Sequence, residues 1–311
     1  MCGIAGIIYR NGNGAHRIGR DMTRMLQAMK HRGPDSTGYA LYRAPGQELV
    51  LRIKLADANT PRDLDFDDLL RRHRTEVQHR LRAAGALITE VQDVNEYTLA
   101  ITLRHDGELK VLADHVESVP GAEVLSAGHS LEIVKDLGDA RTVAGGYGLD
   151  GYFGSHGIGH VRMATESDVD IANAHPYWAY PFSDVAVVHN GQLTNYHLWR
   201  RRLERAGHRF ASECDSEIIA VYLAQKLQGG WSLKDAMGQS LEDLDGVFTY
   251  ICVSEDALGM AKDELAAKPL VLYESDDMVA LASEEMAIRA VIDREIDTYD
   301  PYEREVMVWT R

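Results

Sequence analysis

The feature that most constrains the fold is an apolar run at the start of the chain, directly after a cysteine. Residues 3–9 read Gly-Ile-Ala-Gly-Ile-Ile-Tyr and carry no charge. A strand that is apolar on both sides of its pleat is typical of a sheet covered on both faces. Five further strand-like runs, with helical segments between them, lie at 157–163, 185–189, 247–253, 270–273 and 278–282. The sequence therefore predicts an α+β fold of layered sheets with helices packed outside them, rather than alternating βαβ units.

Residues 45–150 differ in character and are predicted to be a large insertion within a single domain that spans 1–311. A charged helix is expected over 62–83, followed by short strands at 98–103 and 109–112. The arginines of this helix are mixed with acidic residues, so its outer face is either simply solvated or a docking surface. We expect the insertion to be the region that faces a partner.

Composition excludes several classes of partner. The chain has 33 Lys and Arg residues against 48 Asp and Glu, a net charge of −15, and such an acidic surface repels nucleic acid. No apolar run approaches the roughly 20 residues that span a bilayer, and the N-terminus lacks the basic leader of a signal peptide. The three cysteines form no CxxC pair, which argues against a disulfide framework and favours a reducing, cytoplasmic compartment.

Cys2 is the first candidate for chemistry. If Met1 is removed, the α-amine of Cys2 lies beside its own thiol. An α-amine titrates near ~7.7–8.0, so it can take the thiol proton and later return it to a leaving amine. One residue then supplies both the nucleophile and the base. A lone cysteine is more often a small buried hydrophobic residue, and this is the expectation for Cys214 and Cys252. A catalytic role for Cys2 therefore depends on the other motifs in the sequence.

Six short motifs support a catalytic role for Cys2, and their order along the chain is informative. They are Cys2–Gly6, His31–Gly38, Gly159–Thr165, Asn173–Pro176, His189–Tyr196 and Asp215–Glu217. Each motif alone is weak. In this order they resemble the class II glutamine amidotransferases, which are Ntn hydrolases with an αββα sandwich. The resemblance covers roughly residues 1–43 and 155–290 and implies the same fold here, enlarged by the insertion.

The resemblance implies that Cys2 attacks the side-chain amide of glutamine. Asn190, through its side-chain amide, and Gly191, through its backbone N–H, would form the oxyanion hole. Two donors aimed at the developing charge could each lower the barrier by roughly 3–4 kcal/mol. Taken alone, an Asn-Gly pair is also typical of a hairpin turn.

The resemblance also implies the residues that bind substrate. Arg162 would pair with the α-carboxylate of glutamine, Asp215 with its α-ammonium, and Thr165 would add a hydrogen bond. Arg32 would brace the loop beside the nucleophile. Taken singly, Arg162 could instead form a structural ion pair, and Asp215 could cap a helix. Glu166 stands where several relatives have His, which places an additional negative charge near the pocket.

No cofactor is expected on this chain. It has no glycine-rich phosphate loop and no dinucleotide fingerprint. His156 and His160 lack an acidic or Cys companion at metal spacing, so zinc is not expected, and His175 and His189 are expected to pack or to form hydrogen bonds. The last strands end near residue 310, which leaves no room for a synthase domain. The ammonia acceptor, with FMN or iron–sulfur clusters if any, is therefore expected on a separate subunit of a hetero-oligomer.

Within this family, the chain most resembles stand-alone Glx-type subunits of glutamate-synthase-like enzymes, including the amidotransferase subunit of N-methylglutamate synthase. The expected function is a glutaminase that releases ammonia for a synthase subunit. One alternative is a catalytically quiet scaffold of the same complex, and another is a hydrolase that releases methylamine from γ-glutamylmethylamide. A self-processing amidase for other amides is less favoured, because Arg162 and Asp215 suit an α-amino acid.

Overall fold

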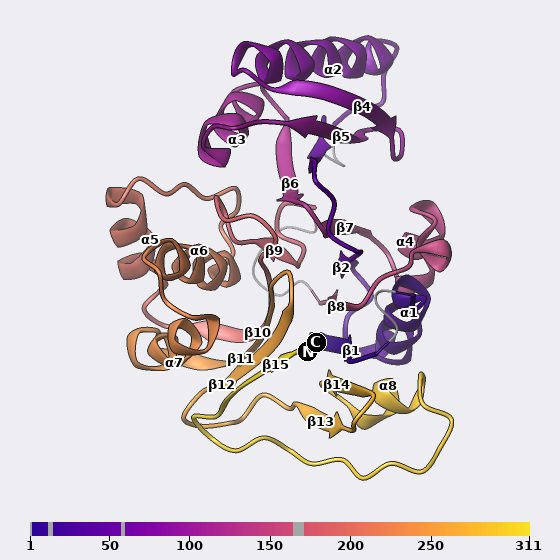
Figure 1. Cartoon of the computed structure of the whole chain (residues 1–311), viewed down its shortest axis with the longest axis vertical. Helices are drawn as coiled ribbons and strands as arrows, with labels where there is room; N and C mark the ends of the chain where they lie inside the picture. Colours follow the sequence, from indigo (N-terminus) through magenta and orange to yellow (C-terminus); the bar gives the residue numbers. More distant parts are fainter. Residues whose placement is uncertain (1, 12–14, 57–59, 164–170) are drawn as a thin grey trace.

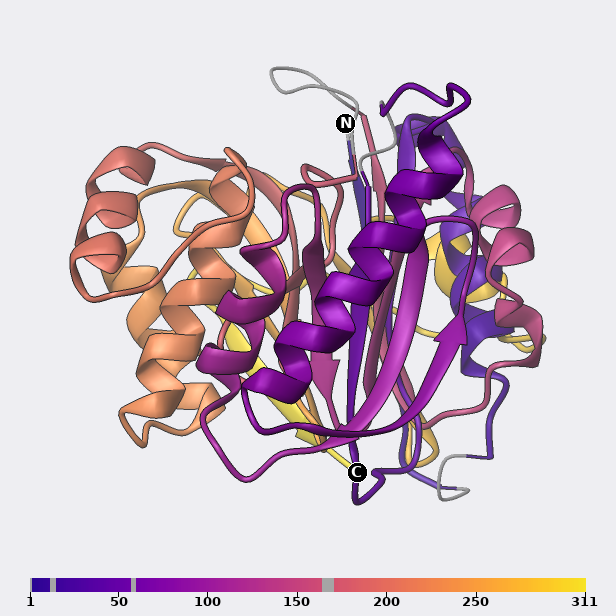
Figure 2. The same cartoon turned by 90° about the horizontal axis from the view of Figure 1, so that it is seen from above.

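The computed structural model describes residues 2–11, 15–56, 60–163 and 171–311, and its core is layered as helix, sheet, sheet, helix (Figures 1 and 2). Helices α1, α4 and α8 pack against one sheet, α6 and α7 pack against the other, and α5 packs on α6. A third hydrophobic cluster fills the space between the two sheets. The predicted α+β class and the αββα layering are confirmed.

The first sheet has six antiparallel strands in the order β13-β14-β1-β8-β2-β7. Their bounds are β1 (Gly3–Tyr9), β2 (Ser36–Tyr42), β7 (Leu131–Leu137), β8 (His156–Arg162), β13 (Val271–Glu274) and β14 (Met278–Ala282). Strand β1 lies between β14 and β8, and Ile4, Ile7 and Ile8 have no exposed surface. Each such side chain stabilises the fold by roughly 1.5–3 kcal/mol relative to an exposed one. The strand predicted over residues 3–9 is thus confirmed, as is its burial on both faces.

The second sheet has five strands in the order β15-β12-β11-β10-β9. Their bounds are β9 (Tyr177–Trp178), β10 (Ala186–Leu193), β11 (Gly246–Val253), β12 (Ala257–Lys262) and β15 (Val306–Thr310). Strand β10 extends beyond its predicted end at residue 189, so that Asn190 and Gly191 pair with Thr249 and Phe248 inside the sheet. The hairpin-turn alternative for the Asn-Gly pair is therefore wrong.

The helices of the core flank these sheets. Their bounds are α1 (Ile18–Ala28), α4 (Ala140–Gly146), α5 (Tyr196–Arg205), α6 (Asp215–Gln228), α7 (Leu233–Asp243) and α8 (Glu285–Arg289), with the short 3₁₀ turns η1 (Lys30–Arg32) and η2 (Leu149–Gly151). Helix α6 is buried from Ser216 to Ala224 and packs on β10, so its first residue lies near the end of that strand. Every helix in the described ranges is too short or too polar to cross a bilayer.

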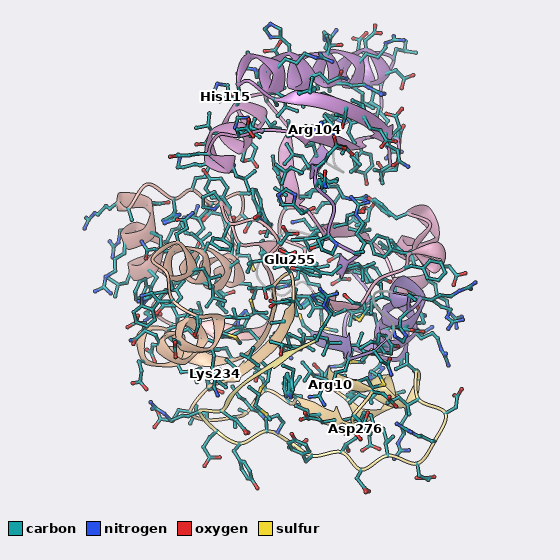
Figure 3. All side chains as sticks on the ribbon, in the orientation of Figure 1. Arg10, Arg104, His115, Lys234, Glu255 and Asp276 are labelled. Atoms are coloured by element: carbon teal, nitrogen blue, oxygen red, sulfur yellow. The ribbon has the colours of Figure 1, made fainter. Side chains whose placement is uncertain are left out.

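Much of the stretch 45–150 forms a third sheet at one end of the molecule (top of Figure 1). Its strands are ordered β4-β5-β3-β6, and its elements are β3 (Leu49–Lys54), α2 (Phe66–Ala83), β4 (Leu87–Asp93), β5 (Thr98–Arg104), α3 (Leu109–Glu117) and β6 (Glu123–Gly128). Figure 3 labels Arg104 and His115 on this unit, and Arg10 and Asp276 near the opposite end of the molecule. Strand β7 and helix α4 return from the insertion to the core.

One expectation for the insertion is wrong. Residues 109–112 form the first turn of helix α3 rather than a strand. Leu109, Leu112, Ala113 and Val116 recur at helical spacing, and the last three are buried. The four-residue window was too short to distinguish a buried strand from one face of a helix.

Asp184 joins the insertion to the core. Its buried carboxylate accepts backbone hydrogen bonds from His129, Ser130 and Leu131 at 2.8–2.9 Å. These donors form the turn between β6 and β7, and Asp184 directly precedes the segment that enters β10. A buried carboxylate needs several such donors to offset its desolvation, so this contact fixes the junction.

Because the imidazole of His156 is buried, we expect the folded protein to lose stability in acid. Burial lowers its pKa to about 4, although its hydrogen bond to the carbonyl of Ser254 opposes the shift. An unfolded His titrates near ~6.5, so below that pH the unfolded chain binds more protons than the folded one. The contribution of His156 to the free energy of unfolding is complete above the pKa of the unfolded state. It falls as the pH drops toward the pKa of the folded state. The slope from this residue is at most about 1.4 kcal/mol per pH unit.

Denaturant unfolding at about pH 7 and about pH 4.5 measures this slope. We expect His156→Gln to lose less stability than the wild type over that interval, because glutamine has no titrating group. Equal pH slopes in the two proteins would contradict the expectation.

Candidate active site

Five of the seven predicted site residues line one cleft with a volume of about 940 Å³. They are Cys2, Arg162, Asn190, Gly191 and Asp215. The cleft lies where β1 begins, β8 ends, and the last residues of β10 meet the start of α6. Arg32 lies behind it, in contact with Cys2. Thr165 and Glu166 fall outside the described residues, so what was expected of them stays a prediction.

Cys2 is held by its backbone, while its thiol lines the cleft. Its carbonyl oxygen accepts a hydrogen bond from Arg32 Nε at 3.0 Å and another from Asn190 Nδ2 at 3.2 Å. The side chain is partly exposed, and Sγ lies 3.7 Å from the carbonyl oxygen of Met163. A side chain on Gly3 would lie 3.0 Å from Val161, so the small residue allows the strand to pack closely here. The backbone is thus fixed without covering the sulfur.

Arg32 is itself braced by a residue that the sequence reasoning did not place in the site. Its guanidinium donates to Glu284 Oε1 at 2.7 Å, and His31 Nε2 lies 3.1 Å from the same carboxylate. Burial would raise the pKa of Glu284, but the hydrogen bonds from Arg32 and His31 outweigh it and hold the pKa below its ordinary value. Glu284 follows β14 and lies within the stretch 155–290 that the resemblance covers, but its pairing with η1 arises only in the fold.

Asn190 and Gly191 enter the cleft from β10. Asn190 is 5% exposed, and its amide reaches the backbone of Cys2 from the second sheet. Gly191 has a φ of 141°, and a Cβ atom at this position would lie 2.1 Å from the carbonyl oxygen of Val247. Only glycine fits both the backbone conformation and the available space.

Arg162 and Asp215 supply opposite charges to the cleft. Arg162 is the last residue of β8 and is 5% exposed. Asp215 is the first residue of α6, and its Oδ2 accepts a hydrogen bond from the backbone N–H of Leu193 at 2.7 Å. The N-cap position belongs to Cys214, so the helix-cap alternative for Asp215 is wrong. Asp215 instead ties the end of β10 to the start of α6.

Three imidazoles lie beside these charged groups. The ring centroids of His160 and His175 are 4.0 Å apart, and those of His175 and His189 are 6.5 Å apart. Burial lowers the pKa of His160 to about 3, and it also lowers the pKa values of His175 and His189. The three rings are therefore neutral near pH 7. His189 forms a hydrogen bond with Ser216 at 2.7 Å.

No group of three or more His, Cys, Asp or Glu side chains within the described ranges is arranged to hold a metal ion. The cleft combines a thiol, an amide donor, a guanidinium and a carboxylate. Such a set can bind a small zwitterion and present a carbonyl group to the sulfur.

Comparison with known sequences identifies relatives along most of the chain. Residues 160–290 match a family model described as a glutamine amidotransferase domain. Over 256 residues the chain is 42% identical to a protein of Methanothermobacter thermautotrophicus named "Putative glutamine amidotransferase", and the match covers 81% of each. Over 251 residues it is 33% identical to the glutamine amidotransferase-like protein GlxB of Rhizobium meliloti, covering 81% of this chain and 78% of GlxB.

Solved structures share the fold. The glutamine phosphoribosylpyrophosphate amidotransferase from B. subtilis, solved with ADP and GMP, superposes on 99% of this chain with a TM-score of 0.62 and 18% sequence identity. This chain spans 47% of that protein, and at this identity the likeness concerns the fold alone. The layered sheets, the family match and the two relatives agree. The chain therefore belongs to the class II glutamine amidotransferases, enzymes built on the Ntn-hydrolase fold.

Proposed function

We propose that this chain is the glutaminase subunit of a hetero-oligomeric, glutamate-synthase-like enzyme of the N-methylglutamate synthase type. The observation that carries the glutaminase role is the convergence of Cys2, Asn190, Arg162 and Asp215 on one cleft. The finer assignment is supported by the resemblance to stand-alone Glx-type subunits and by the 33% identity to GlxB.

In the proposed first step, the α-amine of Cys2 takes the thiol proton after Met1 has been removed. The sulfur then bonds to the side-chain carbonyl carbon of glutamine, and the carbonyl π electrons move to oxygen. A side-chain amide has two N–H donors, and one of those on Asn190 already reaches the carbonyl of Cys2 at 3.2 Å. The second can meet the oxyanion together with the backbone N–H of Gly191.

In the second step, the ammonium group returns its proton to the amide nitrogen. The carbon–nitrogen bond breaks, ammonia leaves, and a γ-glutamyl thioester remains on Cys2. Water, deprotonated by the same amine, then hydrolyses the thioester to glutamate and restores the thiol. The neighbouring imidazoles are poor bases for these steps, because the lowered pKa values of His160, His175 and His189 disfavour proton uptake near neutral pH.

Two of the charged residues that line the cleft, Arg162 and Asp215, suit the two ends of an α-amino acid. In the proposal, Arg162 binds the α-carboxylate through two parallel hydrogen bonds, and Asp215 binds the α-ammonium. Because Leu193 already donates to Oδ2 of Asp215, the carboxylate is oriented before substrate arrives.

The proposal places the ammonia acceptor on a separate synthase subunit in the cytoplasm. Any FMN or iron–sulfur cluster of the complex belongs to that subunit, and this chain binds none. The insertion, which projects from the core in Figure 1, is the proposed docking surface.

Covalent labelling tests the nucleophile. We expect the intact mass of the purified chain to show loss of Met1, and incubation with an electrophilic diazoketone analogue of glutamine to add one adduct. Cys2→Ala should take up no adduct, whereas the matched control Cys214→Ala should still be labelled. A chain that retains Met1 and takes up no label would favour the scaffold alternative.

Steady-state kinetics test the carboxylate-binding role. We expect Arg162→Ala to raise the KM for glutamine by about a hundredfold, the loss of a charge-assisted pair worth roughly 3 kcal/mol, with little change in kcat. Arg162→Lys should restore only part of the affinity, because an ammonium cannot form the bidentate pair. Thermal unfolding controls for folding, and an unchanged KM in a folded variant would refute this role.

Substitution of a single glycine tests the oxyanion hole. We expect Gly191→Ala to lower kcat by about 10²–10³, as the loss of an oxyanion donor does, because the new Cβ would displace β10 from β11. Gly145→Ala in α4 is the matched control, since its Cβ would meet no atom within 4 Å. The control should keep full activity and gain up to about 1 kcal/mol of stability. Wild-type kcat in Gly191→Ala would rule out this geometry.

A further inference from the structure

The segment 206–214, which connects α5 to α6, is tied to the insertion by Arg209. Its Nε lies 2.7 Å from Asp114 Oδ1, and its terminal nitrogen forms an ion pair with Glu117. Both acidic residues lie on α3, on the side of the insertion that faces α5 and α6 (Figure 1). The guanidinium carbon is 3.9 Å from the ring centroid of Tyr180. A planar cation is thus held by two carboxylates and an aromatic face.

The acidic side of this contact is itself fixed. Tyr180 donates a hydrogen bond to Asp114 Oδ1 at 2.6 Å, and Lys110 pairs with Oδ2 at 2.7 Å. Glu117 accepts a hydrogen bond from the backbone N–H of Val124 at 2.8 Å. Burial raises the pKa of Glu117 to about 7, and the charge of Arg209 opposes that rise. Both carboxylates that bind Arg209 are therefore held by further contacts within the fold.

Beyond Arg209, hydrogen bonds tie the rest of the segment to the first turns of α6, next to the cleft. The backbone N–H groups of Ala211 and Ser212 each donate to the buried carboxylate of Glu217 at 2.8 Å. The hydroxyl of Ser212 then accepts from the backbone N–H of Cys214 at 3.2 Å. Cys214 and the adjacent Asp215 line the cleft. A displacement of the segment at residue 209 would therefore act on the start of α6, where Asp215 directly follows the segment.

We infer that Arg209 is a positioning residue for the substrate's α-ammonium group, acting on Asp215 through the segment 206–214. This inference rests on the proposed function. The nucleophile is held independently, through the bonds of Arg32 and Asn190 to the Cys2 carbonyl. Release of Arg209 should consequently weaken recognition of the amino-acid end of glutamine and leave the reactivity of Cys2 unchanged.

Labelling kinetics with two probes separate these effects. The first probe is the diazoketone analogue of glutamine, followed by intact mass to obtain its half-saturating concentration and its maximal rate. The second is iodoacetamide, which has no amino-acid end, with peptide mapping to distinguish Cys2 from Cys214. For Arg209→Ala we expect the half-saturating concentration of the analogue to rise about tenfold, within the range of coupling between contacting residues. Its maximal rate and the iodoacetamide rate at Cys2 should change less than about twofold.

Substitutions of the acidic partners of Arg209 provide a second test, which does not depend on whether Arg209→Ala folds. Asp114→Asn and Glu117→Gln should each shift the half-saturating concentration in the same direction, and combining either with Arg209→Ala should add little, because the partners act as a unit. Arg209→Lys should restore part of the affinity. Arg74→Ala is the matched control, since it removes an insertion arginine that pairs with Asp93 instead.

The outcomes distinguish the two proposals. A wild-type chain that takes up no analogue overturns the proposed function, and this inference with it. A labelled wild type with the same half-saturating concentration in Arg209→Ala overturns only the inference. Equal losses toward both probes also overturn it, because they would indicate general damage to the site.

Discussion

The site depends on how the carbonyl oxygen of Cys2 is held. It accepts one hydrogen bond from Arg32, which Glu284 braces beside the first sheet, and one from Asn190, which belongs to the second. Cys2 directly precedes β1, which is an interior strand between β14 and β8, so Cys2 is joined to a strand that is held on both sides. A residue next to a chain terminus would ordinarily fray. Here two charged or polar side chains from distant segments fix its backbone and leave the thiol in the cleft.

The two sheets supply different halves of the site, and burial sets the charge around it. Cys2 and Arg162 come from the first sheet, and Asn190 and Gly191 from the second. Asp215 joins them because α6 packs on β10 and its carboxylate bonds to the last strand residue, Leu193. The buried imidazoles of His160, His175 and His189 stay neutral, so the charged side chains that line the cleft are those of Arg162, Glu213, Asp215 and Lys268. The same packing that forms the core therefore orients the site.

Local sequence patterns predicted the structure correctly where a pattern is compatible with only one kind of element. The uncharged apolar run after Cys2 required a strand covered on both faces, and β1 is such a strand. The cleft residues were indicated by the resemblance of six motifs, taken in order, to a known family. Where the window was short the pattern failed, as at 109–112, since four apolar residues do not distinguish a strand from the face of α3.

Contacts across long sequence separations lay beyond the reach of the sequence. Nothing in the chain's order indicates that Glu284 braces Arg32, 252 residues away, or that Arg209 pairs with α3. The same holds for Asn190 and Gly191, whose local signal favoured a turn until pairing with β11 placed them within a strand. The sequence by itself determined the layered class, because this class follows from residue type and local spacing, and it indicated the cleft residues through the resemblance of six ordered motifs to a known family. Only the tertiary structure decided the distances between the cleft residues, the charge states of the buried groups and the side chains that hold the site in place. These arise from packing between segments that are far apart in the chain.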